Sequence, residues 1–211
     1  MKFLTQAPAR DGLAQVAIKI TSMSIADARL WHQLIQPASA EAGDADQNWN
    51  WPSMRRWLPL TEIALGRRAP AFSVWVESVN GEAIPAGMIL LCEGYPSLDN
   101  SGAQSIYIWF MAAAPESALL ANGIKAIPKL GRVLIDIGVT HSHNCGYHGR
   151  IGLHASPQGG DKLLSFYRNA GFTLLPVEAK LPRESRTNDG RYLYFDEHQA
   201  KKWSNSLNSC R

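Results

Sequence analysis

The sequence predicts an α+β fold in which one mixed, mostly antiparallel sheet is flanked by helices. Segments with apolar residues at alternate positions, typical of strands, are interspersed with longer segments whose apolar residues recur every three or four positions, typical of helices. The Asn80-Gly81 pair between two strand-like segments predicts a hairpin. The 211 residues, 45% of them hydrophobic, are enough for one large domain. We therefore expect a single domain over residues 1–211, with a core at about 15–196 and a short C-terminal tail.

The first half of the chain predicts four strands and two helices. The strands are expected at 15–20, 71–77, 87–92 and 105–112, and the last two are apolar on both faces, as central strands are. Ser24 is positioned to cap a helix that ends near Ile35. A second helix is expected from Pro52 to Gly66, kinked or divided by Pro59. The polar segment 37–50 between them predicts an exposed loop.

The second half predicts strands and helices in alternation. Residues 128–139 have the apolar spacing of a helix, and Pro128 suits its first turn. A strand at 151–154 is followed by a turn, then by a helix capped by Asp161 and ended by Gly171. Strands at 173–175 and 191–195, separated by a charged loop, complete the expected order.

Composition excludes several classes of protein. No apolar run approaches the roughly 18 residues of a membrane span, and the start of the chain has too short an apolar stretch for a secretory signal. A net charge of +3 without a clustered basic face does not favour nucleic acid as a partner. Three widely spaced cysteines (Cys92, Cys145 and Cys210) favour reduced thiols and hence a cytoplasmic location.

The segment GRIGLHASPQGGDKLLSFYRNAGF, residues 149–172, is the most informative motif. It resembles the last conserved motif of the GNAT superfamily of acyl-CoA-dependent N-acetyltransferases, a strand followed by a helix that ends on an aromatic residue, Tyr, three residues and Gly-Phe. The element order is also that of GNAT proteins, over roughly 15–195. The resemblance implies that Tyr167 faces the thioester sulfur, and the alternative is a tyrosine that serves only in the core.

Two further segments resemble the acyl-CoA site of the GNAT family. MAAAP (111–115) resembles the strand end that pairs with the pantetheine arm, which implies Met111, Ala112 and Ala113 as cofactor-binding residues. IPKLGRVLID (127–136) resembles the phosphate-binding turn and helix, which implies Lys129, Leu130, Gly131 and Arg132. Lys129 stands where the family has its first glycine, and Ala126 stands where it has Gln or Arg. Lys129 and Arg132 either supply charge to the phosphates or are ordinary surface cations.

Acetyl transfer to an amine requires a base, a stabilised oxyanion and a proton for the leaving thiolate. The resemblance implies that Tyr167 donates that proton and that a backbone N–H near 111–113 meets the oxyanion. His154, at a strand end, and Glu93, after an apolar strand, are the candidate bases, and a chain of water molecules is equally compatible.

Two side-chain clusters have alternative interpretations. His141, His143, Cys145 and His148 are all metal-ligand types, but their spacing matches no common zinc motif, and no metal is expected. Four tryptophans lie in the first third of the chain and form either an aromatic acceptor pocket or core packing. They are Trp31, Trp49, Trp51 and Trp57.

The resemblance implies an N-acetyltransferase that uses acetyl-CoA and a primary amine, with no nucleic acid or membrane partner. A homodimer is one possibility for its assembly. One alternative is a GNAT-fold binding or regulatory protein with weak catalysis, favoured by the degenerate phosphate turn. A less favoured alternative is a metal-dependent hydrolase built on the His/Cys cluster.

Overall fold

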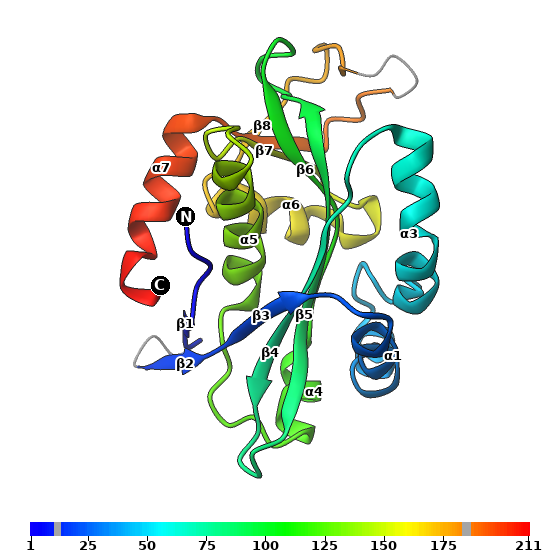
Figure 1. Ribbon diagram of the computed structural model, residues 1–211, viewed down its shortest axis with the longest axis vertical. Coiled ribbons are helices and arrows are strands. Elements are labelled where there is room, and N and C mark those ends of the chain that lie inside the picture. Colours follow the sequence, from blue (N-terminus) through cyan, green and yellow to red (C-terminus); the bar gives the residue numbers. More distant parts are fainter. Residues whose placement is uncertain (11–13, 183–186) are drawn as a thin grey trace.

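A seven-stranded mixed sheet forms the centre of the molecule (Figure 1), in a computed structural model that describes residues 1–10, 14–182 and 187–211. Its strand order is β3-β4-β5-β6-β7-β9-β8, and the β6–β7 pair is parallel while the other pairs are antiparallel. The strands are β3 (Lys19–Ser22), β4 (Ala71–Glu77), β5 (Ala83–Pro96), β6 (Gln104–Ala113), β7 (Ile151–His154), β8 (Thr173–Leu174) and β9 (Tyr192–Phe195). The predicted α+β class with one mostly antiparallel sheet is confirmed.

Helices cover both faces of this sheet. Figure 1 shows α5 (Leu130–Asn144) and α7 (Glu197–Ser206) on one side, and α1 (Ile25–Leu34) and α3 (Trp51–Leu65) on the other. The apolar stripe of α5, which includes Val133, Leu134 and Ile137, is fully buried. Leu134 packs so closely on β5 that a Cβ at Gly87 would lie 3.1 Å from its side chain. The largest part of the core therefore lies between α5 and the strands β5 and β6.

The strands β6 and β7 separate before β6 ends. They pair only from Ile106–Ile151 to Ile108–Leu153, and β7 ends at His154. β6 continues to Ala113 along β5. The edge of β6 beyond Ile108 therefore faces an opening in the sheet, and helix α6 (Gly160–Asn169) follows β7 beside it.

Local sequence explains most helix starts, with one error in the prediction. Ser24 caps α1 as predicted, and it forms a capping box with Asp27. Asp161 does not cap α6, so that prediction is wrong. A short 3-10 turn, η1 (Pro157–Gly159), leads directly into α6, whose N-cap is Gly159, and Asp161 lies inside the first turn. An acidic side chain there still favours the positive end of the helix dipole.

The prediction of a loop over 37–50 is also wrong. The supposed loop contains a helix, α2 (Gln36–Ala42), because Pro37 suits a first turn and the following residues are mostly Ala, Ser and Glu. Pro59 does not divide α3, which runs through it. Pro59 is exposed, so water can bond the carbonyl that lacks its helical donor.

Both ends of the chain pack against the rest of the protein. Helix α5 runs to Asn144, five residues beyond its predicted end, and α4 (Glu116–Ala121) was not predicted. Residues beyond 196, expected as a tail, form α7, capped by Asp196, and η2 (Asn208–Cys210). Arg211 bonds the buried carboxylate of Asp136 on α5 at 2.7 Å. Strands β1 (Gln6–Pro8) and β2 (Gln15–Ala17) pair near the C-terminus.

The predicted charged loop lies partly outside the described residues, at 183–186. None of the described helices is long and apolar enough to cross a membrane.

Candidate functional site

A cavity of about 700 Å³ lies where β6 and β7 separate. It is lined by every residue that the sequence analysis assigned to cofactor binding and by two of the three candidate catalytic residues. These are Met111, Ala112, Ala113, Lys129, Leu130, Gly131, Arg132, His154 and Tyr167. Glu93 is the exception, because it does not line this cavity. The structure therefore brings together residues that are more than fifty positions apart in the sequence.

The free edge of β6 presents backbone groups to the cavity. The Ala114 N–H donates to Ala86 on β5 at 2.9 Å, and the antiparallel register is regular from Phe110 to Ala113. Because backbone groups alternate sides along a strand, Ala112 also turns its amide toward β5. Met111 and Ala113 turn their N–H and C=O groups the other way, into the gap. Two of the three predicted backbone positions are thus available to a ligand.

Tyr167 reaches the cavity from α6. Its side chain is 6% exposed, and burial raises the pKa of its hydroxyl well above the usual value. Among the described residues, none forms a hydrogen bond with this hydroxyl. Arg191 holds the turn before α6 by donating to the carbonyls of Ala155 and Gly160, both at 2.8 Å. The hydroxyl therefore stays protonated near neutral pH. The hydrogen bonds from Arg191 fix the start of the helix that carries it.

His154 lines the cavity from the end of β7. Its Nε2 contacts Asp189 Oδ2 at 2.9 Å, and its ring packs on Tyr192 with centroids 4.5 Å apart. Burial alone would raise the pKa of Asp189, but the hydrogen bond and charge of His154 hold it below its usual value. Asp189 therefore orients the ring. This arrangement resembles the base and orienting carboxylate of many hydrolytic sites.

The start of α5 is a partial anion site. Gly131 packs under Phe166, so a Cβ there would lie 2.6 Å from the Phe166 ring. The Leu130 and Arg132 amides already donate to the carbonyls of Pro128 and Lys129, both at 2.9 Å. Among the described residues, the Gly131 N–H has no backbone partner. The start of α5 therefore offers an anion fewer free backbone N–H groups than the start of an ordinary α-helix does.

The cations near this helix start differ in their contacts. Arg132 extends to α7, where it donates to Ser206 Oγ at 3.1 Å and lies 5.0 Å from the Trp203 ring centre. Lys129 lines the cavity and, among the described residues, forms no ion pair. Arg10 also lines the cavity and pairs with Glu116. Arg10 could not be found from the sequence, because only the bridge between Ala9 and Pro128 places it here.

Asp46 is a cavity residue that the sequence analysis missed. It is 7% exposed, and its Oδ2 has no hydrogen-bond partner among the described residues. Burial, with a smaller effect from Asp44, raises the pKa of Asp46 to about 6. The buried amide of Gln36 fixes this segment by donating to the carbonyls of Asp46 and Gln47, at 2.8 and 3.0 Å. The available signal was an acidic residue shortly before Trp49 and Trp51, inside a segment interpreted as exposed.

The tryptophans divide between the two interpretations. Trp31 and Trp51 are fully buried and pack edge to face in the core. Trp49 lines the cavity and contacts Phe110 of β6, with ring centres 5.0 Å apart. Trp57 is 60% exposed and belongs to neither group. One tryptophan out of four thus forms a wall of the cavity.

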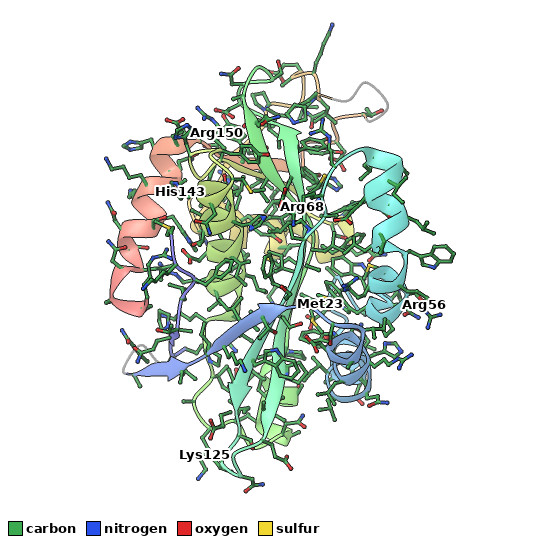
Figure 2. All side chains as sticks on the ribbon, viewed as in Figure 1. Met23, Arg56, Arg68, Lys125, His143 and Arg150 are labelled. Carbon is green, nitrogen blue, oxygen red and sulfur yellow. The ribbon has the colours of Figure 1, made fainter. Side chains whose placement is uncertain are left out.

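His141, His143, Cys145 and His148, which the sequence analysis considered together, do not form one cluster. His141 and Cys145 lie near each other and are joined by Glu93, and the ligand atoms of these three lie within 4.8 Å of one another. His143 instead packs against Gly149 beside α7, as its place in Figure 2 shows. Glu93 faces α5 because β5 is irregular between Cys92 and Tyr95, where Gly94 has a φ of +62°. A hydrolase built on all four residues therefore has no structural support.

Comparison with solved structures identifies the fold. No protein-family model matches the sequence, and no curated protein matches it. A GNAT-family acetyltransferase from Staphylococcus aureus Mu50 has a TM-score of 0.55 at 17% identity, over 86% of this chain and 99% of that one. The crystal structure of AtaTR bound with AcCoA has a TM-score of 0.52 at 18% identity, over 88% of this chain and 96% of that one. The predicted fold is thereby confirmed: this chain has the fold of GNAT acetyltransferases.

Proposed function

We propose that this protein transfers an acetyl group from acetyl-CoA to a primary amine. The observation that carries the proposal is that one cavity holds the free edge of β6, the start of α5 and Tyr167, whose hydroxyl no described residue hydrogen-bonds. AtaTR, of the same fold, is a protein whose crystal structure contains AcCoA. The residues selected by resemblance, except Glu93, thus line one cavity, which supports the proposal.

The cavity residues fit acetyl-CoA. The outward N–H and C=O groups of Met111 and Ala113 can pair with the amides of a pantetheine arm as an added strand would. The Gly131 N–H, with Lys129 and Arg10 nearby, offers positive charge to a pyrophosphate. Since Arg132 bonds α7, the proposal assigns the phosphate contact to Lys129 and Arg10.

The chain supplies each proton transfer that acetyl transfer needs. His154, oriented by Asp189, accepts the proton of the attacking amine. The Met111 or Ala113 N–H donates to the oxyanion while the carbon–nitrogen bond forms. Tyr167 protonates the sulfur as the carbon–sulfur bond breaks, and its hydroxyl regains a proton from solvent. The products are an N-acetyl amine and CoA.

Asp46 and Trp49 form the acceptor side of this proposal. A buried carboxylate beside an aromatic face, with one oxygen that no described residue hydrogen-bonds, favours a cationic ligand over a neutral one. An ammonium group at Asp46 would contact Oδ2 in the bound state, lose one proton to solvent to become a neutral amine, and lose the second to His154 as it attacks. The proposed acceptor is therefore a primary amine that binds in its protonated form.

A binding protein of the same fold is the second candidate. The specific observation in its favour is the start of α5, where the Leu130 and Arg132 amides are occupied and Arg132 faces α7. Such a protein would bind acetyl-CoA without releasing CoA in the presence of amines, which separates it from the enzyme.

Acetyl-CoA is expected to raise the melting temperature of the protein, and Lys129→Ala is expected to weaken its binding. At 100 times its dissociation constant a ligand adds about 2.7 kcal/mol to the stability of the folded state. Loss of one charge near a phosphate should raise the dissociation constant for CoA by roughly 5- to 10-fold, or about 1 kcal/mol, and less at high salt. Calorimetry with CoA and with pantetheine measures both effects.

Lys125→Ala is the matched control, because Lys125 is an exposed cation four residues earlier that does not line the cavity and lies at the lower end of the molecule in Figure 2. It should leave CoA affinity unchanged. Pantetheine, which lacks the pyrophosphate, should bind the wild type and Lys129→Ala equally. Equal losses for CoA and pantetheine, or an equal effect of Lys125→Ala, would place the phosphates elsewhere.

A further inference from the structure

Glu93, His141 and Cys145 form a compact cluster away from the cavity. His141 Nε2 lies 2.8 Å from Glu93 Oε1 and 3.7 Å from Cys145 Sγ. His141 and Cys145 are four residues apart at the end of α5, so they share one helix face, and Glu93 comes from the irregular part of β5. Three ligand types from two elements therefore converge on one point at the edge of the core.

The geometry of this cluster excludes a nucleophile–base–carboxylate relay. In such a relay the nucleophile and the orienting carboxylate contact opposite nitrogens of the histidine ring. Here both Glu93 and Cys145 contact the same nitrogen, Nε2. Burial, with the charge of Glu93, also raises the pKa of the Cys145 thiol, the reverse of what an activated cysteine needs.

The same geometry suits a tetrahedral metal ion. Ligands bound to zinc at about 2.0–2.3 Å lie roughly 3.3–3.8 Å from one another. The separation of His141 Nε2 from Cys145 Sγ is already 3.7 Å, and Glu93 would move by about half an ångström. The Glu93 and His141 side chains are only 13% and 17% exposed. Packing therefore leaves these side chains few other conformations, and they stay close to the arrangement that a metal ion needs.

Charge gives a second reason for a cation. Glu93 and a thiolate at Cys145 repel each other. A dication bound between these two groups and His141 would relieve that repulsion. Arg68 is the nearby positive charge that acts on Cys145, and it lies at the margin of the cluster, on the far side of α5 from His143 (Figure 2). The Arg68 carbonyl accepts the Glu93 N–H at 2.9 Å, which fixes the backbone of Glu93.

We propose that Glu93, His141 and Cys145 bind a zinc-type transition-metal dication, with one position left for water. Thiolate, imidazole and carboxylate together favour Zn²⁺ over Mg²⁺ or Ca²⁺, which prefer oxygen ligands alone. The ion would connect the C-terminal end of α5 to β5. Since the N-terminal end of α5 lines the cavity, the metal would stabilise the helix that carries Lys129 and Gly131. This proposal does not depend on acetyl transfer.

The test is titration of untagged, chelator-treated protein with Zn²⁺ and with Co²⁺. We expect one ion per chain, a higher melting temperature with Zn²⁺, and with Co²⁺ the strong visible bands of a tetrahedral site and the near-ultraviolet band of a thiolate ligand. Cys145→Ser should abolish the thiolate band. Glu93→Gln, which keeps a hydrogen bond to His141, should weaken Zn²⁺ by more than about tenfold, as lost metal contacts do.

His143→Ala is the matched control, because it removes a histidine from the same helix two positions away, on the side that faces α7. It should bind Zn²⁺ as the wild type does. The proposal would be overturned by a wild type that binds neither ion. It would also be overturned if Cys145→Ser kept the thiolate band, or if His143→Ala lost binding as severely as Glu93→Gln.

Discussion

Tyr167→Phe is expected to lower the kcat of acetyl transfer by about 10²–10⁴-fold, the range for removal of a positioned acid. The hydroxyl faces the cavity, and among the described residues nothing hydrogen-bonds it, so its loss removes no structural contact. The ring, which packs on Phe172 with centroids 5.6 Å apart, is kept. Melting temperature and affinity for acetyl-CoA should therefore change little. Steady-state release of the CoA thiol, beside a melt of the variant, measures these quantities.

Tyr194→Phe is the control for this substitution, because Tyr194 is a partly buried tyrosine on β9 that does not line the cavity. It should turn over at the wild-type rate. Tyr167→Ala, in contrast, should destabilise the fold by roughly 3–5 kcal/mol because it leaves a cavity in the core. If Tyr167→Phe turned over normally, the tyrosine would serve only in the core.

Asp46→Asn is expected to stabilise the protein near pH 8 while it impairs use of the amine. A pKa raised from 3.8 to about 6 means that the folded state resists ionisation of Asp46. The stability that a neutral Asp46 gives is fully present below pH 3.8 and is lost as pH rises through about 6. At 1.36 kcal/mol per pKa unit the loss is about 3 kcal/mol, so the Asn variant should be more stable by about 1–3 kcal/mol near pH 8.

The same variant should lower kcat/KM for the amine by about 10- to 100-fold, mainly through KM, because an uncharged amide holds an ammonium group less well. In the wild type kcat/KM should fall below pH 6 as Asp46 takes up a proton, and that decline should be less steep in Asp46→Asn, where only the requirement for an unprotonated base at His154 remains. Asp161→Asn, an exposed acid outside the cavity, is the control. An unchanged KM with unchanged stability would remove Asp46 from the acceptor side.

Much of the fold could be predicted because its signals are local. The apolar runs over 71–77 and 105–112 reflect strands that are largely buried, and Ser24 with Asp27 satisfies the first amides of α1 within four residues. The start of α6 was missed because η1 and Gly159 precede it and satisfy the chain there without an aspartate cap. The helix α2 was missed because the composition of 37–50 as a whole indicated a loop, although Pro37 suits a first turn.

The residues of the candidate site also fall into two groups, those that local sequence motifs predicted and those that only tertiary contacts place. Tyr167, Lys129 and Met111 were predicted because they belong to contiguous motifs, and the structure brings them to one cavity. Asp46 and Arg10 were missed because only tertiary contacts, through Gln36 and the β1 strand, place them there. Glu93 was assigned to the wrong region, since the irregularity of β5 turns it toward α5. A side chain that is positioned by a β-bulge, or by contacts with residues far away in the sequence, produces no hydrophobic periodicity that could reveal it.

Release of the CoA thiol from acetyl-CoA, in the presence and absence of a panel of primary amines, tests the central claim most directly. The account predicts that at least one amine accelerates thiol release well above the rate without amine, and that mass spectrometry finds the N-acetyl product in equal amount. It also predicts that the amines accepted carry positive charge at the assay pH, as Asp46 requires. Tight binding of acetyl-CoA without thiol release for any amine would contradict catalysis and favour the binding protein. Absence of acetyl-CoA binding would contradict the assignment of the cavity itself.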